Sequence, residues 1–120
     1  MAKNIKKTEI LELKGFLSFL ILHELNTEHL CGEDLAIRIG RRKGSVLTPG
    51  TIYPALKKLY KMKLIKFKRD GRKKRYELSD SGKVELGSLY KKFSNYFYGL
   101  KQHIKRGHYE AVPRGKKTFY

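Results

Sequence analysis

The first quarter of the chain carries apolar residues at intervals of three and four positions, which is the spacing of one face of an α-helix. These residues are Ile10, Leu13, Leu17, Leu20 and Ile21. Thr8 stands where it can cap such a helix, so the pattern predicts a helix over residues 9–25. Phe16, Phe19 and Leu22 widen the apolar face beyond a single stripe. We therefore expect this helix to contact a second surface in addition to its own core.

Two more helices are expected before the pattern changes. The first, over residues 33–39, has its apolar residues at Leu35, Ala36 and Ile39. It is expected to end at Gly40. Thr48 followed by Pro49 is typical of the start of the next helix. Threonine caps helices, and proline at the first helical position lacks only an N–H group that would be unpaired anyway.

The third predicted helix is amphipathic. Its core face consists of Ile52, Leu56 and Leu59. At 100° per residue, Gly50, Lys57 and Lys61 fall on the opposite side. Pro54 removes one backbone hydrogen bond in the second turn, but its ring also points outward, so we expect a kink and not a break.

Between residues 64 and 78 the apolar period changes to two, which predicts two short strands. The alternating apolar residues are Ile65 and Phe67 in the first strand and Tyr76 and Leu78 in the second. A two-residue turn at Asp70-Gly71 would pair Phe67 with Lys74 and place an apolar and a charged side chain on one face. A four-residue loop over residues 70–73 pairs Phe67 with Tyr76 instead, and we prefer it.

A last long helix is predicted over residues 80–105, with Ser79 as its cap. Its apolar residues follow a spacing of 3, 4, 3 and 4, which is typical of a coiled-coil seam, at Leu86, Leu89, Phe93, Tyr96 and Leu100, with Phe97 beside them. A chain this small has little core left to cover such a seam, so we expect an interface with another subunit. The chain thus divides into residues 1–79, a helix over residues 80–105 and a basic tail over residues 106–120.

The charge of the chain indicates which class of partner it binds. The 120 residues, enough for one domain, include 28 Lys and Arg against 11 Asp and Glu, a net charge of +17. Residues 1–37 hold four basic and six acidic side chains, whereas residues 38–120 hold twenty-four and five. A polyanionic partner is therefore expected to bind the last two thirds of the chain.

Other chemistry is poorly represented in the sequence. Cys31 is the single cysteine, and no CxxC or HExxH spacing is present. His29 and Cys31 could be two metal ligands, but a loop histidine beside a small buried thiol is the favoured interpretation. No Ser-His-Asp, paired-carboxylate or phosphate-loop pattern appears. We expect no metal, no cofactor and no enzymatic activity.

No segment favours a membrane location. The most apolar stretch, residues 16–25, is far shorter than the roughly 20 residues that span a bilayer. The first residues resemble neither a signal peptide nor a transit peptide. We expect a cytoplasmic protein that does not bind membranes.

Three helices followed by a two-stranded hairpin with a basic tip is the order of a winged helix-turn-helix, mainly α with a small β-hairpin. In that fold the third helix enters the major groove of DNA and the hairpin, or wing, contacts the backbone nearby. Residues 66–75 contain seven basic side chains and one acidic one. The expected DNA contacts on the helix are Thr48, Thr51, Lys57, Lys58 and Lys61, and those on the wing are Arg69, Arg72, Lys73 and Lys74.

Two segments resemble a known family. TPGTIYPALKKLYKMKLI at residues 48–65 and GRKKRYELSDSGK at residues 71–83 resemble the PadR-like transcriptional regulators. Their third helix carries a Pro-Gly-Thr-aliphatic-Tyr-Pro-Ala-Leu signature, and a basic wing leads into a Tyr-x-Leu-Thr-x-x-Gly junction. Ser79 stands where that junction has threonine. The likeness covers about residues 13–85, and the single C-terminal helix is similar to that of the family's short members.

The resemblance implies a homodimer in which the C-terminal helix packs against the partner, beside its first helix. This agrees with the apolar seam and with Phe16 on the wide face of the first helix. The resemblance also implies that Tyr53, with Gly50 and Thr51, lies near DNA. From helical geometry, Tyr53 stands at the edge of the core face, so a contact between its hydroxyl and phosphate and simple packing are both open.

We therefore predict a sequence-specific regulator, a repressor, that binds double-stranded DNA as a homodimer. Two third helices would enter successive major grooves of an inverted repeat, about 34–36 Å apart. The alternative is an architectural, chromatin-like protein with little sequence choice, and RNA binding is less supported. An aromatic cluster could line a cavity for a small hydrophobic effector, although ordinary interface packing is favoured; its members are Phe16, Phe19, Tyr90, Phe93, Tyr96, Phe97 and Tyr98.

Overall fold

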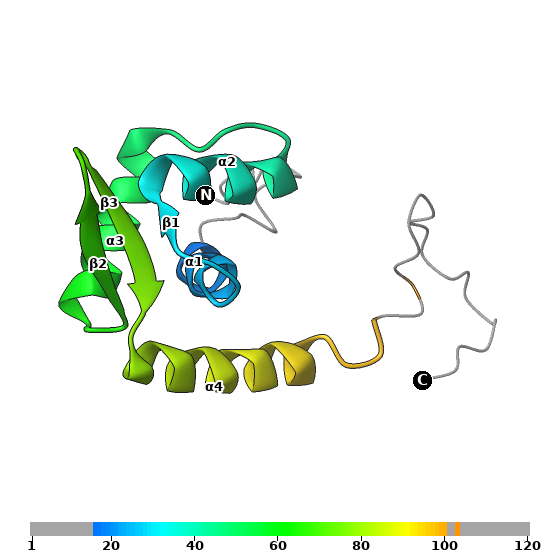
Figure 1. Cartoon of the computed structure of the whole chain (residues 1–120). Helices are drawn as coiled ribbons and strands as arrows, with labels where there is room; N and C mark the ends of the chain where they lie inside the picture. Colours follow the sequence, from blue (N-terminus) through cyan, green and yellow to red (C-terminus); the bar gives the residue numbers. More distant parts are fainter. Residues whose placement is uncertain (1–15, 101–102, 104–120) are drawn as a thin grey trace, which may run out of the picture. The chain divides into compact units, whose positions relative to one another are not determined.

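The computed structural model describes residues 16–100 and residue 103 (Figure 1). The elements in chain order are α1 (Leu17–Leu25), β1 (Leu30–Cys31), α2 (Gly32–Lys43), α3 (Pro49–Lys61), β2 (Ile65–Asp70), β3 (Lys73–Leu78) and α4 (Asp80–Tyr96). The chain divides into two compact units, with the boundary in the sequence between Gly87 and Ser88. The cap at Thr8, the start of the first helix and the tail over residues 106–120 lie outside the described residues.

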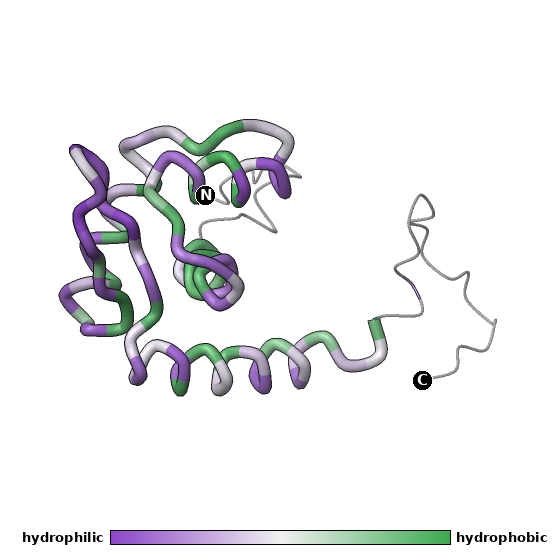
Figure 2. The backbone as a smooth tube through the Cα atoms, in the orientation of Figure 1, coloured by the Kyte–Doolittle hydropathy of each residue, from purple (hydrophilic) through white to green (hydrophobic). Residues whose placement is uncertain are grey.

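The core of the first unit lies where α1, α2 and α3 pack against one another and against the sheet. Its most buried large side chains are Ile21, Leu22, Leu35, Ile39, Ile52, Leu56, Leu59, Ile65 and Leu86. Leu22, expected on a second surface, belongs to this core, whereas Phe16 and Phe19 are only partly covered. Figure 2 shows the contrast between the hydrophobic α1 and the hydrophilic turn end of the hairpin.

The three strands form an antiparallel sheet in the order β1-β3-β2. Ile65 pairs with Leu78 and Phe67 with Tyr76, so the register predicted from the apolar alternation is confirmed. The expected four-residue loop is wrong, because pairing continues to the ends of both strands and leaves a two-residue turn of Gly71 and Arg72. Gly71 has φ +64°, which glycine adopts without steric cost.

Strand β1 was not predicted. It has only two residues, Leu30 and Cys31, which pair with Tyr76 and Arg75. Two residues cannot display a period, so the strand depends on β3, which lies more than 40 residues further along the chain. The consequence for the site is that the N-terminus of α2 is held beside the wing.

Helix α2 is longer than expected. It continues through Gly40 to Lys43 and ends at Gly44, which has φ +92°. Gly40 is needed for a different reason, because a Cβ there would collide with the backbone of Ser45, Val46 and Leu47. The glycine therefore lets the α2–α3 connection fold back over the helix, where the amide of Leu47 donates to the carbonyl of Ala36 at 3.1 Å. Helix α3 runs through Pro54 without a break, as predicted.

Helix α4 starts as predicted and ends earlier than predicted. The Ser79 hydroxyl accepts a hydrogen bond from the amide of Gly82 at 3.0 Å, which is the expected N-cap. The same hydroxyl donates to the carbonyl of Lys63 at 2.6 Å, so the cap also joins α4 to the turn after α3. The helix ends at Tyr96 and not near residue 105. Within the described part of the chain, no helix is both long and apolar enough to cross a membrane.

Candidate nucleic-acid interface

Helix α3 presents one covered face and one exposed face. Ile52, Leu56 and Leu59 are buried in the core. The predicted contact residues on this helix are all exposed, namely Thr48, Gly50, Thr51, Tyr53, Lys57, Lys58 and Lys61. The amphipathic period thus orients the helix so that three lysines and a small, hydroxyl-bearing N-terminal turn face outward.

Thr48 occupies the N-cap position of α3 but does not cap it with its side chain. Its backbone is extended, and its carbonyl accepts the amide of Ile52 at 3.1 Å. The hydroxyl instead lies 3.0 Å from the hydroxyl of Thr51. The expectation of a side-chain cap is therefore wrong. The reason is that Thr51, one turn along the same face, offers the Thr48 hydroxyl another partner.

Tyr53 packs against the first residue of α2. A Cβ atom at Gly32 would lie 2.7 Å from Cε1 of Tyr53 and 3.0 Å from its hydroxyl oxygen. The Tyr53 residue is nevertheless 45% exposed. Burial raises the pKa of the Tyr76 hydroxyl, and the nearby Tyr53 raises it further. Packing is therefore real at Tyr53, and it holds the phenol in one place at the edge of the exposed face of α3.

An aromatic contact joins the wing to α3. The ring of Phe67 on β2 lies 5.2 Å from that of Tyr60 on α3 and 5.8 Å from that of Tyr76 on β3. The ammonium of Lys74 lies 4.7 Å from the centre of the Phe67 ring, which is a cation–π contact. Sequence reasoning missed Tyr60, because it lies outside the buried stripe of its helix. This aromatic contact fixes the wing beside α3.

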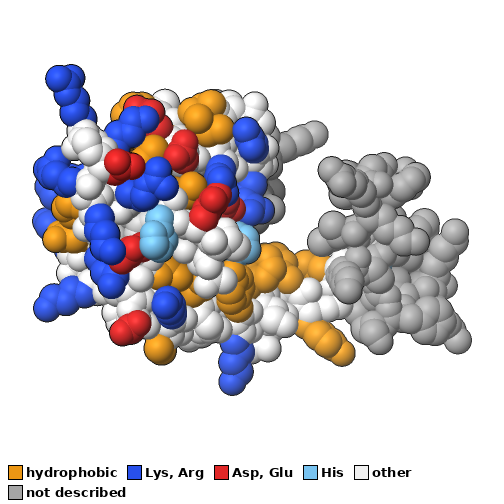
Figure 3. Space-filling model, viewed as in Figure 1, with side chains coloured by type: hydrophobic (Ala, Val, Ile, Leu, Met, Phe, Trp, Pro, Cys, Tyr) orange, Lys and Arg blue, Asp and Glu red, His pale blue; other side chains and the backbone are white. Residues whose placement is uncertain are grey.

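The basic residues of the wing differ in whether they form an ion pair with an acidic side chain. Lys73 lies 3.5 Å from Glu33 on α2, and this carboxylate raises the pKa of the Lys73 ammonium. Arg75 pairs with Asp70 at 3.5 Å. Arg69 and Arg72 are exposed and have no ion pair with any described residue. On the face seen in Figure 3, Lys and Arg side chains gather over the hairpin.

Glu77 is a buried acid within this basic sheet. The residue is 8% exposed, and its carboxylate lies 3.3 Å from Lys66 and 3.3 Å from Nδ1 of His29. Burial raises the pKa of Glu77, but the hydrogen bond from Lys66 and the charges of His29 and Lys68 outweigh it, so the pKa is lowered. The pair with His29 ties the loop before β1 to β3.

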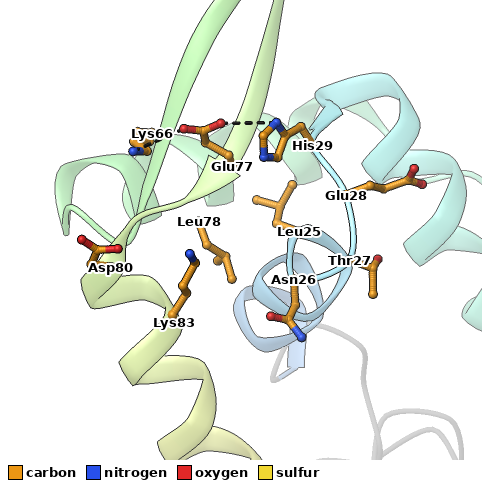
Figure 4. A pocket seen from close by; sticks show the side chains of 10 residues that line it. All are labelled: Leu25, Asn26, Thr27, Glu28, His29, Lys66, Glu77, Leu78, Asp80 and Lys83. Atoms are coloured by element: carbon orange, nitrogen blue, oxygen red, sulfur yellow. Dashed lines mark ion pairs between the residues drawn. The ribbon is translucent and has the colours of Figure 1, made fainter.

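A hollow of about 360 Å³ opens beside Glu77 (Figure 4). Its lining residues are Leu25, Asn26, Thr27, Glu28, His29, Lys66, Glu77, Leu78, Asp80 and Lys83. Three acids and two lysines are among these residues, so the hollow has no strong preference for one sign of charge. We assign it no ligand.

Cys31 and His29 do not act together. The Cys31 thiol is buried and donates to the carboxylate of Asp34 at 3.2 Å, whereas His29 is exposed and pairs with Glu77. This agrees with the favoured interpretation of a loop histidine beside a buried thiol. Among the described residues, no group of three His, Cys, Asp or Glu side chains could hold a metal ion.

The predicted dimerisation residues differ in how far the single chain covers them. Leu86 is 2% exposed within the single chain, so it is a core residue and its assignment to the interface is wrong. Phe93, Tyr96 and Leu100 are exposed, and Phe16, Leu89 and Phe97 are partly covered. In the second unit the rings of Phe93 and Phe97 lie 4.5 Å apart. The remaining apolar residues stay candidates for an interface.

The chain has relatives among protein families and solved structures. The model of the transcriptional regulator PadR-like family matches residues 21–88. A PadR-like transcriptional regulator from Bacillus cereus is 26% identical, with a TM-score of 0.67 over 75% of this chain and 92% of its own. A PadR family transcription regulator from Clostridium difficile is 25% identical, with a TM-score of 0.64 over 76% of this chain and 100% of its own.

RosR from H. salinarum is 22% identical, with a TM-score of 0.62 over 68% of this chain and 76% of its own, a likeness of fold alone. No curated protein sequence matches the chain. The family model covers more than half of the chain, including α2, α3 and the whole wing. The chain therefore belongs to the transcriptional regulator PadR-like family, and its fold is the winged helix of those regulators.

Proposed function

We propose that this protein is a DNA-binding transcriptional repressor that binds an inverted-repeat operator as a homodimer. The observation that carries the proposal is the exposed face of α3, which holds three lysines and lies beside a basic wing joined to it through Phe67. A helix so exposed and flanked by cations is suited to the major groove. The proposal places the protein in the cytoplasm, where it meets the DNA.

Each part of the surface has a separate task in this proposal. Lys57, Lys58 and Lys61 contact phosphates along the groove, while Arg69 and Arg72 hold the wing to the backbone. Such contacts supply affinity that weakens as salt rises, and they carry little sequence information. The hydroxyl of Tyr53, held against Gly32, contacts a phosphate at the edge of the groove.

The homodimer is supported by the apolar residues that the second unit leaves exposed. Phe93, Tyr96 and Leu100 follow the spacing of a coiled-coil seam, and a second copy of the chain would cover them. Two copies related by a two-fold axis would present two α3 helices to an inverted repeat. Ordinary packing of the aromatic residues from Tyr90 to Tyr98 within this interface is favoured, and a site for a small hydrophobic effector among them is the alternative.

The test compares two duplexes of equal length, the protein's own upstream DNA and a scrambled sequence. Fluorescence anisotropy of the full chain measures both affinities across a range of salt concentrations. We expect the upstream site to bind roughly a thousandfold more tightly or better. If both duplexes bind equally and their affinities fall in parallel as salt rises, the result would contradict the proposal of a specific operator. It would favour the architectural alternative, which the net charge of +17 supports.

A further inference from the structure

The surface that α3 would present to base edges has an unusual chemistry. Between Gly44 and Leu56 the chain contains no Arg, Lys, Asn, Gln, Asp or Glu. Besides Ser45 and the phenol of Tyr53, what it exposes there are small apolar groups and hydroxyls: Val46, Thr48, Pro49, Thr51 and Pro54. Val46 is 62% exposed, although valine is a residue that folding normally covers. This surface, residues 46–54, is called the methyl-bearing surface below.

This chemistry restricts how bases can be read. In the major groove, Arg or Lys selects guanine, Asn or Gln selects adenine, and Asp or Glu accepts from cytosine. None of these side chains is present on the methyl-bearing surface. The remaining specific feature is the C5-methyl group of thymine, which pairs with apolar side chains and with the methyl group of threonine.

The hydroxyl groups do not change this conclusion. Those of Thr48 and Thr51 lie 3.0 Å apart and bond to each other. A threonine hydroxyl can donate or accept, so it suits several bases and discriminates weakly. The first lysine of α3 is Lys57, eight residues after Pro49, which is about 12 Å along the helix axis. The cations therefore flank the methyl-bearing surface and do not replace it.

The backbone at this surface can approach DNA closely. At Gly50 a Cβ atom would meet only the hydroxyl of Thr48, at 3.9 Å, so the space in front of the first turn is open. Val46 precedes this turn, and Pro54 follows it by about one turn on the exposed side. Apolar groups thus surround a bare stretch of helix, which allows them to reach methyl groups in the groove.

We propose that this protein selects its DNA sites by van der Waals contact with thymine methyl groups, made mainly by Val46 and Thr51. This inference rests on the proposed function, since it names what the same surface recognises. Phosphate contacts from the lysines and the wing supply most of the affinity, and the methyl contacts supply the choice of sequence. The preferred half-sites carry thymine at the positions that face the first turn of α3.

The first experiment changes only the DNA. The full chain selects duplexes from a random library, and each thymine of the winning site is then replaced in turn by deoxyuridine, which lacks the 5-methyl group. Anisotropy at one salt concentration measures each duplex. At each contacted position we expect affinity to fall about fourfold, as one buried methyl-sized group implies. Positions outside the contact should be unchanged.

The second experiment changes only the protein. Thr51→Ser removes the methyl group and keeps the hydroxyl, whereas Thr51→Val keeps a methyl group and removes the hydroxyl. At the base that Thr51 contacts, Thr51→Ser should bind thymine and deoxyuridine equally, and Thr51→Val should retain the difference. Val46→Ala removes both γ-methyl groups but keeps an apolar Cβ, so it should reduce the difference between thymine and deoxyuridine at its own base. Lys61→Met is the matched control, because it should weaken both duplexes by the same factor.

The outcomes separate this inference from the proposed function. If no sequence is enriched from the library, the proposed function itself fails. If a site is enriched but deoxyuridine is tolerated at every position, the regulator stands and methyl recognition is overturned, in favour of DNA shape. If deoxyuridine weakens binding equally in wild type, Thr51→Ser and Val46→Ala, the methyl groups act through the duplex and the assignment to these side chains is wrong.

Discussion

At the scale of single residues, the site depends on the absence of a side chain at Gly32. Gly32 begins α2 and leaves room for the ring of Tyr53, which belongs to α3. The contact lies between two helices of the helix-turn-helix, so it sets both their spacing and the position of the phenol. The backbone at Gly32 does not require glycine for its conformation, since it is helical. Space is the reason for glycine here.

Gly32→Ala should displace Tyr53 and weaken DNA binding. A Cβ 2.7 Å from Cε1 is closer than atoms tolerate, so the ring must rotate or shift. We expect a loss of roughly 1–2 kcal/mol in the free energy of unfolding and a several-fold loss of affinity. Thermal denaturation and anisotropy measure the two effects.

The control for this prediction is the Tyr53→Ala background. There Gly32→Ala should be neutral or slightly stabilising, because it no longer meets a ring and alanine favours a helix over glycine. An equal loss of stability in both backgrounds would show that Gly32 acts independently of Tyr53.

Glu77 should make stability depend on pH. The folded-state pKa lies below the ordinary value of 4.5, so the ionised carboxylate stabilises the fold above that pH. The contribution is lost as the pH falls from 4.5 through the lower folded-state pKa. Glu77→Gln should reduce stability at neutral pH and flatten the acid limb of the stability profile, as measured by chemical denaturation. Glu85→Gln, on a carboxylate without an ion pair to any described residue, is the control and should leave the acid limb unchanged.

At the scale of elements, the wing is positioned by aromatic packing and charged by residues that are not equivalent. The ring of Phe67 contacts that of Tyr60 on α3, so β2 and β3 are held beside α3. Lys73 and Arg72 are neighbours at the tip, yet only Lys73 has a carboxylate partner, Glu33. A charge that must leave a partner before it binds phosphate contributes less to binding.

Arg72→Ala should therefore cost more DNA affinity than Lys73→Ala. We expect Arg72→Ala to weaken all sequences about equally and to reduce the slope of log affinity against log salt by about 1. Lys73→Ala should have a smaller effect, and Glu33→Gln should strengthen binding by releasing Lys73. Anisotropy titrations at several salt concentrations measure these slopes. If Lys73→Ala proves the more damaging change, the ion pair with Glu33 does not restrain Lys73.

At the scale of the whole molecule, the proposed repressor is a pair of chains. A monomer presents one α3 helix to DNA, whereas an inverted repeat requires two such helices at a defined spacing. The exposed apolar residues of the second unit, among them Tyr96 and Leu100, are the candidates for joining the chains. Dimerisation should therefore control operator binding more than binding to a half-site.

Tyr96→Asp together with Leu100→Asp should produce monomers. The added charges would be buried without partners in the interface, which is costly. Sedimentation velocity should show half the mass of the wild type, and operator affinity should fall while half-site affinity persists. Val84→Asp, at an apolar position on α4 that is 76% exposed and lies outside the seam, is the control and should remain a dimer. A dimeric double variant would place the interface elsewhere.

Three predictions from local spacing were confirmed: the third helix, the hairpin register and the Ser79 cap. The third helix and the Ser79 cap depend on residues within a few positions of one another, and the hairpin register depends on two segments joined by a short turn. The turn length was missed, because apolar pairing sets the register but does not show how far the ladder extends past the last apolar pair. The prediction that α2 ends at Gly40 was wrong. A glycine in a sequence does not reveal whether it ends a helix or leaves room for a neighbouring backbone segment.

The sequence by itself determined the order of the helices and of the two hairpin strands, the outward direction of the basic residues and the family. Helical and strand periods and the family signature are all properties of nearby positions. Only the tertiary structure decided that β1 pairs with β3, that Leu86 belongs to the core, that Tyr53 rests on Gly32 and that Glu77 is enclosed by Lys66 and His29. Each of these depends on residues distant in the chain, and burial is a property of what packs against a residue and not of the residue itself.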